Sequence, residues 1–174
     1  IKDFFPDWQP EVTSDYKLVT DEKELAELAG KLKEAGEFSV DLETTSKDPV
    51  SAEIVGISIC HEEGKAYYIP VGHRYMGAPE QLPLDEVLEV LRPILEDEKT
   101  GKVGQNLKYD SEVFERAGVR LRGIRFDSMI GAYLLNPTRN SYGLEVLSAA
   151  FLGRPKKSYK DVCGSGKAEI PFAE

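Results

Sequence analysis

Apolar and polar residues alternate along residues 38–43, which predicts a β-strand around which the rest of the chain is organised. The apolar side chains would lie on one face of this strand and the polar ones on the other: Phe38, Val40 and Leu42 against Ser39, Asp41 and Glu43. Residues 44–49, with the sequence Thr-Thr-Ser-Lys-Asp-Pro, then turn the chain away. Two carboxylates are therefore expected side by side at the end of a strand.

Patterns on either side of this strand predict further elements of the same domain. They are a short strand over residues 16–19, a helix from Thr20 or Asp21 to about Ala35 that Gly36 ends, and two strands over residues 53–60 and 66–70. A turn at Gly64 joins the last two strands, so we expect them to form a hairpin beside the 38–43 strand.

The second half of the chain is mostly helical by pattern. The expected elements are a helix over residues 85–96, a strand over 102–105, a helix over 107–117, a helix over 124–136 after a short extended piece, and a helix over 144–152. Pro93 removes one backbone donor, so we expect it to kink or restart the first of these helices. This order indicates a mixed sheet flanked by helices, in a single α/β domain over residues 16–174. Residues 1–15 show no periodicity and are interpreted as an N-terminal arm or interdomain linker.

Composition and charge exclude several classes of protein. The chain has 174 residues, of which 41% are hydrophobic and 30% charged, as is typical of a folded globular domain. No apolar run approaches the roughly 20 residues that span a bilayer, so no membrane partner is expected. The net charge of −9 argues against a protein that grips a nucleic-acid duplex over a large surface, because that affinity comes mostly from Lys and Arg on phosphates. Cys60 and Cys163 give neither a disulfide framework nor metal-ligand spacing, which favours a reducing, cytoplasmic location.

Asp41 and Glu43 are the first candidates for chemistry. Two like charges this close repel unless they share a cation, and hard divalent ions prefer oxygen ligands. An Asp-x-Glu pair on its own is more often a solvated strand end than a metal site. The pair therefore needs a second motif before it indicates a metal site.

The second candidate motif is Gly104–Asp110, with the sequence Gly-Gln-Asn-Leu-Lys-Tyr-Asp, at the start of a predicted helix. Ligands gather beyond strand ends and at helix starts in open α/β sheets, and the free N–H groups there favour anions. We expect Asp110 to face the Asp41 pair while a phosphate lies near Gln105 and Asn106. The alternative is that Asn106 only caps the helix and Asp110 is a favourable acid in its first turn.

Together, the two motifs resemble those of the three-prime to five-prime exonucleases with four acidic ligands. Within that superfamily, Val103–Asp110 is very similar to the proofreading domains of family A, DNA-polymerase-I-like enzymes. The resemblance runs over nearly the whole chain and includes Ile94–Lys99, Gly123–Met129, Leu135–Asn136 and Leu147–Gly153. It implies a ribonuclease-H-like fold that hydrolyses phosphodiester bonds at a single-stranded DNA 3' end and releases nucleoside monophosphates. It also implies a polymerase domain in the same parent chain.

The resemblance further implies which residues form the site. Asp41, Glu43 and Asp110 would be catalytic and would hold two divalent metal ions, Mg²⁺ or alternatively Mn²⁺ or Zn²⁺. Two such ions stabilise both the attacking and the leaving oxygen of a displacement at phosphorus. The residues implied to contact the terminal nucleotides are Thr44 through its backbone, Gln105, Asn106, Tyr109 and Tyr159. Tyr159 would stack on a terminal base, although ordinary loop packing is an alternative explanation.

The chain departs from the family pattern in three places. The Tyr-x-x-x-Asp motif that should supply a fourth carboxylate is absent, which we interpret as truncation before that motif, with weak or no activity as the result. Lys47 occupies a position that is often apolar in relatives, and Tyr142 stands where relatives often have His. Asp127 resembles a fourth ligand, but its place just before Ser128-Met129-Ile130 predicts a helix cap.

Two rival functions stay open at this point. The first is a catalytically inactive exonuclease-like domain that acts as a structural or DNA-guiding module, which loss of the acidic residues would favour. The second is a free-standing RNA-processing exonuclease of the same superfamily, which the polymerase-like Gly104–Asp110 motif argues against. His61 and His73 fall in turn-like segments, and we interpret both as surface residues.

Overall fold

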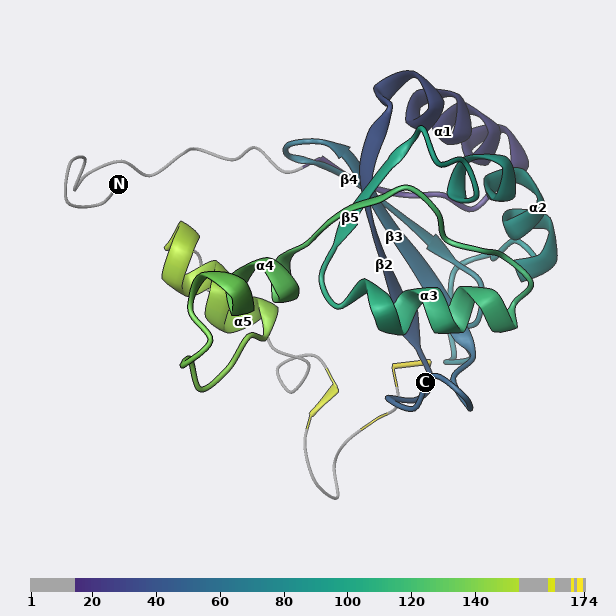
Figure 1. Cartoon of the computed structure of the whole chain (residues 1–174). Helices are drawn as coiled ribbons and strands as arrows, with labels where there is room; N and C mark the ends of the chain where they lie inside the picture. Colours follow the sequence, from purple (N-terminus) through teal and green to yellow (C-terminus); the bar gives the residue numbers. More distant parts are fainter. Residues whose placement is uncertain (1–14, 154–162, 165–169, 171, 174) are drawn as a thin grey trace.

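The computed structural model describes residues 15–153, 163–164, 170 and 172–173. Within these residues the chain forms a mixed sheet of six strands in the order β1-β4-β3-β2-β5-β6 (Figure 1). The strands are β1 (Asp15–Leu18), β2 (Glu37–Thr44), β3 (Ile54–Glu62), β4 (Lys65–Pro70), β5 (Gly101–Gly104) and β6 (Ile124–Asp127). The helices are α1 (Glu22–Ala35), α2 (Leu84–Leu95), α3 (Leu107–Arg116), α4 (Ser128–Leu135) and α5 (Leu144–Leu147), which continues as a π-helical segment over Ser148–Leu152. Strand β3 is antiparallel to its neighbours β2 and β4, and the other strand pairs are parallel.

Helix α1 begins and ends at the capping residues that the sequence predicts. The Asp21 side chain caps the helix by accepting the Glu24 N–H at 2.8 Å. Gly36 ends it with a φ of +70°, a backbone conformation that glycine adopts at little cost. The predicted hairpin is also confirmed, because β3 and β4 pair antiparallel beside β2.

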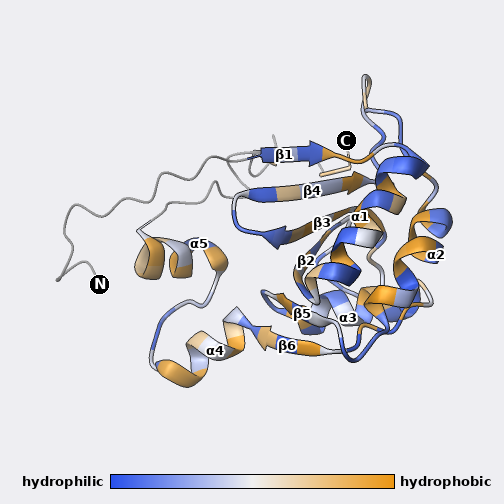
Figure 2. Cartoon of the chain, turned by 90° about the horizontal axis from the view of Figure 1, so that it is seen from above, coloured by the Kyte–Doolittle hydropathy of each residue, from blue (hydrophilic) through white to orange (hydrophobic). Residues whose placement is uncertain are grey.

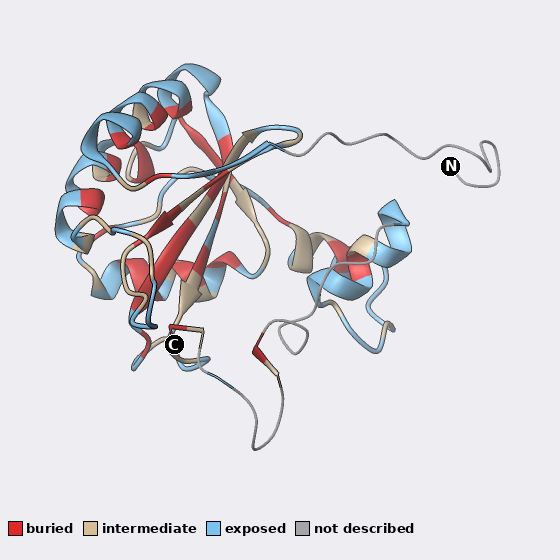
Figure 3. Ribbon diagram, turned by 180° about the vertical axis from the view of Figure 1, so that it is seen from behind, coloured by how far each residue is buried: buried red, intermediate tan, exposed pale blue. Residues whose placement is uncertain are grey.

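The alternation along β2 decides which face of the sheet is buried. Phe38, Val40 and Leu42 are at most 7% exposed and join one hydrophobic core with the buried side chains of α1, α2 and α3. These three helices gather on one side of the sheet, and Figure 3 shows the buried residues concentrated on the central strands and on the inner faces of the helices. The polar side chains of β2, including Asp41 and Glu43, therefore lie on the opposite face.

One expectation for the second half of the chain is wrong. Residues 124–127 form strand β6 instead of the start of a helix, because they pair in parallel with β5, with Gly104 opposite Asp127. A four-residue strand carries too little pattern to be recognised locally, so long-range pairing decides its structure. Pro93 lies inside α2 near its C-terminal end, and the helix continues to Leu95 without a restart, so a kink at Pro93 stays a prediction.

Helices α4 and α5 stand apart from the other three (Figure 1) and keep much apolar surface exposed. Hydrophobic colouring covers much of β6 and α4 in Figure 2. The exposed apolar side chains here are Phe126, Ile130, Tyr133, Leu134, Leu135, Leu144, Val146, Phe151 and Leu152. A hollow of about 480 Å³ lies among several of them.

No helix in the described part of the chain is long and apolar enough to cross a membrane. Cys60 and Cys163 are both free thiols. Cys60 Sγ donates to the Glu62 backbone carbonyl at 3.1 Å.

Candidate active site

On the side of β2 that faces β5, the described residues provide no strand neighbour beyond Ser39. Helix α3 lies there instead. Strand β5 pairs with β2 only over Glu37–Ser39 and ends at Gly104, after which the chain enters α3. The Leu42 N–H, which has no strand partner on this side, donates to Asp110 Oδ1 at 2.9 Å. Asp110 is 3% exposed. The short β5 strand thus brings a buried carboxylate from α3 to the backbone between Asp41 and Glu43.

Asp110 lies in an unfavourable electrostatic environment. Burial, and then the neighbouring Asp41 carboxylate, raise the pKa of Asp110 to about 7. The hydrogen bond from the Leu42 N–H acts in the opposite direction, and Asp127 adds a smaller contribution that raises the pKa. The prediction that Asp110 faces Asp41 therefore agrees with the structure. A cation between these two carboxylates would relieve their repulsion.

The donor types at this strand end fit a hard divalent ion. Asp41, Glu43 and Asp110 offer carboxylate oxygens, the ligands that Mg²⁺ and Mn²⁺ prefer. Among the described residues, no three His, Cys, Asp or Glu side chains are gathered closely enough to hold an ion as they stand. Binding of a cation would therefore draw these carboxylates closer together.

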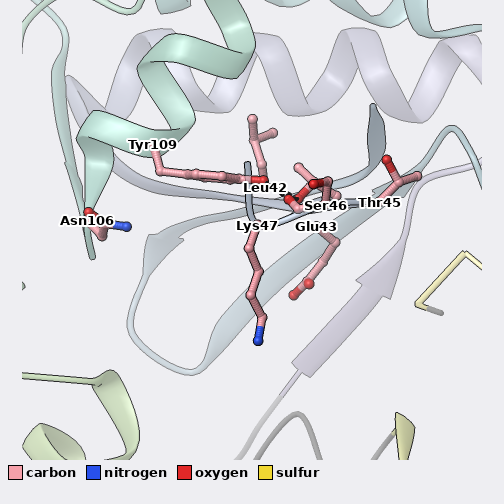
Figure 4. Close-up of a pocket in the computed structure, with 8 residues that line it drawn as sticks. Leu42, Glu43, Thr45, Ser46, Lys47, Asn106 and Tyr109 are labelled. Atoms are coloured by element: carbon pink, nitrogen blue, oxygen red, sulfur yellow. Dashed lines mark hydrogen bonds between the residues drawn. The ribbon is translucent and has the colours of Figure 1, made fainter. Parts of the chain in front are cut away.

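Glu43 lines a hollow of about 450 Å³ at the end of β2 (Figure 4). Its side chain extends in the same direction as that of Lys47, and Asn106 stands at one end of the hollow. Asp41 lines a neighbouring hollow of about 320 Å³ together with Gln105 and Ser128. The two carboxylates thus border adjacent depressions on the polar face of the sheet.

Tyr109 anchors the turn that follows the acidic strand. Its hydroxyl donates to the Ser46 carbonyl and is hydrogen-bonded to the Thr44 hydroxyl. The Thr44 hydroxyl also lies 3.0 Å from the Ser46 carbonyl oxygen, so its one hydrogen is shared between that oxygen and Tyr109. Two residues that the family resemblance implies for nucleotide contact, Thr44 and Tyr109, therefore lie together, and each holds the same turn.

Asp127 caps two helices at once. Its carboxylate accepts the N–H groups of Met129 and Ile130 at the start of α4, which confirms the predicted cap. It also accepts the N–H groups of Asn106 at 3.1 Å and Leu107 at 2.7 Å at the start of α3. These two α3 donors are therefore not available to a phosphate, in contrast to the expectation from the sequence.

Asn106 occupies the N-cap position of α3 but does not cap the helix with its side chain, as the alternative explanation required. Asn106 has no side-chain capping bond, and it is the one non-glycine residue with positive φ in the described part of the chain, at +60°. Asparagine tolerates this conformation better than most residues, and it leaves the exposed side chain beside the hollow. Gln105 donates to the Tyr142 carbonyl at 2.8 Å and accepts from the Ser128 hydroxyl, so it fastens α4 and the following loop to β5. The remaining predicted contact residue, Tyr159, lies outside the described residues.

Sequence reasoning missed the hydrogen-bonded pair of Tyr68 and His73. His73 Nε2 lies 2.7 Å from the Tyr68 hydroxyl oxygen, and Tyr68 lies on the polar face of the sheet that also carries Glu43. Burial, followed by the Glu43 charge, raises the pKa of Tyr68. His61 and His73 are both half-buried, so the interpretation that they are surface residues is wrong. The period-two pattern could have placed Tyr68 on the Glu43 face, but the contact with His73 depends on the fold of the loop.

Comparisons with known proteins give a consistent result. The sequence profile of a family described as 3'-5' exonuclease matches residues 16–174. The chain is 40% identical over 160 residues to DNA polymerase I of Pseudomonas aeruginosa, in an alignment that covers 91% of this chain and 18% of the relative. The chain therefore spans less than a fifth of the length of that relative.

Solved structures share the fold. RNase D of Trypanosoma brucei superposes with a TM-score of 0.69 at 17% identity, over 87% of this chain and 52% of that one. NrnC of Brucella melitensis with bound Mg²⁺ superposes with a TM-score of 0.59 at 16% identity, over 84% of this chain and 65% of that one. At these identities the likeness shows the fold alone, and it confirms the predicted ribonuclease-H-like class.

Proposed function

The chain belongs to the family of 3'-5' exonuclease domains of DNA polymerase I, and from this premise we propose that it removes nucleotides from the 3' end of single-stranded DNA. The observation that supports this most is the contact between α3 and the end of β2, where Asp110 accepts the Leu42 N–H beside Asp41. Nucleoside monophosphates would be the products. Residues 16–174 would act as the exonuclease part of a longer chain that also contains a polymerase.

Asp41, Glu43 and Asp110 would hold divalent ions, Mg²⁺ or Mn²⁺. Two such ions, when bound, supply stabilisation of charge on the attacking and leaving oxygens of an in-line displacement at phosphorus. The three carboxylates differ in how firmly the protein holds them. Asp110 is fixed by its hydrogen bond to the β2 backbone, whereas Asp41 and Glu43 project from the polar face of the strand.

The residues around the hollow would position the last nucleotides of the strand. Tyr109 and Thr44 hold the turn after β2 in place, which fixes the backbone of that turn against the substrate. Asn106 presents its side chain beside the same hollow, and Gln105 keeps α4 next to it. Lys47 offers a positive charge to a backbone phosphate in an otherwise acidic site.

The experiment uses two single substitutions on the same strand. A single-stranded DNA labelled at its 5' end is incubated with the chain at high protein concentration and with Mn²⁺ or Mg²⁺. We expect a ladder that shortens from the 3' end, is abolished by Glu43→Gln, and is retained by Glu37→Gln, which changes an exposed acid on the same face at the other end of β2.

Two results would contradict the proposal. They are shortening that Glu43→Gln leaves unchanged and shortening that proceeds from the 5' end. An RNA strand of the same sequence is the comparison for substrate class, and faster shortening of the RNA would contradict the choice of DNA.

A further inference from the structure

Tyr68 lies on the polar face of the sheet, opposite Ser58 of β3, which is itself opposite Asp41, and its ring extends along that face toward Gly56. Glu43 pairs directly with Gly56 of β3, and a Cβ atom on Gly56 would lie 1.9 Å from the Tyr68 hydroxyl oxygen. The hydroxyl therefore fills the space that a side chain at position 56 would occupy. Cβ atoms of directly paired residues lie about 4.5–5.5 Å apart, so a Glu43 carboxylate that turns toward β3 can reach this hydroxyl.

His73 fixes the position of the Tyr68 hydroxyl. Its Nε2 atom lies 2.7 Å from the hydroxyl oxygen. The His73 backbone is held in turn by both ends of the Gln81 amide, which accepts the His73 N–H at 2.7 Å and donates to the His73 carbonyl at 2.9 Å. The imidazole also packs against Phe172, with ring centroids 5.6 Å apart. The hydroxyl is thus held on a side chain whose own position is restrained from several directions.

The direction of the Tyr68–His73 hydrogen bond depends on the imidazole tautomer, and the nearby Glu43 charge bears on it. A phenol donates one hydrogen bond, and donation to His73 Nε2 would turn its lone pairs toward the negative carboxylate. Donation in the other sense, from His73 Nε2–H to the Tyr68 oxygen, leaves the phenolic hydrogen for Glu43. Hydrogen bonds to an ionised acceptor are the stronger kind, which favours this second arrangement. Because burial and the Glu43 charge raise the pKa of Tyr68, the hydroxyl keeps its hydrogen at neutral pH.

We propose that Tyr68 is a positioning residue for Glu43, whose carboxylate it orients for cation binding through a hydroxyl that His73 holds in place. The inference rests on the proposed function, because it assigns Tyr68 and His73 to the ligand shell around the same site. Groups that orient a metal ligand often matter almost as much as the ligand itself, since they fix the direction of its lone pairs.

The test measures Mn²⁺ affinity directly, by the loss of the free-ion signal in electron paramagnetic resonance, and does not depend on turnover. Tyr68→Phe removes the hydroxyl and keeps the ring, and it should weaken Mn²⁺ binding by roughly 10-fold or more. His73→Leu should weaken binding to a similar extent, whereas His73→Gln, which keeps an N–H donor near the Nε2 position, should recover part of the affinity. The double variant Tyr68→Phe with His73→Leu should be no weaker than Tyr68→Phe alone, because both changes remove the same interaction.

Tyr67→Phe is the matched control. Tyr67 precedes Tyr68 in β4 and lies on the opposite face of the sheet, where its ring stacks on that of His61 with centroids 5.6 Å apart, so it forms a second tyrosine–histidine pair on the face away from the carboxylates. This variant should bind Mn²⁺ like the unchanged chain. Unchanged affinity in Tyr68→Phe, or an equal loss in Tyr67→Phe, would overturn the inference. Mn²⁺ binding that is absent, or that Asp41→Ala does not abolish, would overturn the proposed function itself and the inference with it.

Discussion

Two buried aspartates, Asp127 at the end of β6 and Asp110 in α3 beside β2, have opposite environments. The Asp127 carboxylate at the end of β6 accepts four backbone N–H groups from the starts of α3 and α4. Asp110 in α3 accepts the Leu42 N–H and lies close enough to Asp41 that the second carboxylate raises its pKa. Both side chains are at most 9% exposed.

The difference separates a carboxylate whose charge the protein itself stabilises from one whose charge it leaves beside another negative charge. At Asp127 the protein itself supplies the positive end of two helix dipoles and enough donors for a buried charge, so nothing further is needed. At Asp110 the protein buries a carboxyl beside a like charge, which costs stability unless a proton or a cation is present. The site thus carries an unfavourable interaction that a divalent ion would relieve.

The largest expected effect is on catalysis. Asp110→Asn keeps an oxygen that can accept the Leu42 N–H but removes the charge, so the metal-dependent rate of single-strand shortening should fall by roughly 100–1000-fold. Initial rates with Mn²⁺ measure this, with Glu112→Gln as the control, because Glu112 is a solvent-exposed acid of the same helix. A rate within tenfold of the unchanged chain would show that Asp110 does not serve the reaction.

The same chemical change at Asp127 should act on stability instead. Asp127→Asn replaces one acceptor oxygen with an amide that faces the Leu107 N–H, and it removes the charge from two helix starts. The free energy of unfolding should fall by about 2–3 kcal/mol. Urea unfolding measures this, and a loss below about 0.5 kcal/mol would mean that the double cap contributes little.

In the metal-free protein, Asp110→Asn should raise the free energy of unfolding, whereas Asp127→Asn should lower it. A carboxyl with a folded pKa of about 7, above its unfolded value of 3.8, binds its proton more tightly in the folded state, so stability is lost as the pH rises through this window. The substitution removes that loss. It should raise the free energy of unfolding by about 1–2 kcal/mol at pH 8 and by almost nothing near pH 4. Urea unfolding with a chelator at both pH values checks this, and a destabilised variant at pH 8 would contradict it.

The smallest expected effect concerns the turn after β2, which Tyr109 of α3 holds in place. Tyr109→Phe removes the hydroxyl that bonds to the Thr44 side chain and the Ser46 carbonyl. Unfolding free energy should fall by about 1 kcal/mol, the net contribution of an ordinary hydrogen bond. Urea unfolding beside Tyr133→Phe, which changes an exposed tyrosine of α4, provides the comparison. Equal stability of the two variants would show that the turn is held by other contacts.

Local signals predicted most of the fold, and long-range contacts account for the errors. The Asp21 and Gly36 ends of α1 depend on neighbouring residues and could be recognised in the sequence. Residues 124–127 could not, because their strand conformation depends on pairing with β5 about twenty residues earlier. The same holds for Asp127, whose cap on α4 is local and was predicted, whereas its cap on α3 joins residues 20 and 21 positions apart and was missed.

The candidate site also combines features that the sequence predicts with features that depend on long-range contacts. The motif around Asp110 and its expected approach to Asp41 could be inferred from the sequence, because a helix that follows a short strand must begin at the strand end. The electrostatic contrast with Asp127 could not, since it depends on how many N–H groups each carboxylate accepts. The position of Tyr68 beside Glu43 depends on a glycine in the strand between them, and the sequence gives no local sign of that contact.

The most direct test of the account is the titration of Asp110 itself. Nuclear magnetic resonance of the carboxyl carbon can follow this residue in the metal-free protein and again with saturating Mg²⁺, with Asp110→Asn used for assignment. We expect an apparent pKa near 7 without metal, and a fall toward or below the ordinary value of 3.8 when Mg²⁺ is bound. An ordinary pKa in the metal-free protein, or a raised pKa that Mg²⁺ leaves unchanged, would contradict the claim that this buried carboxylate is held for a cation.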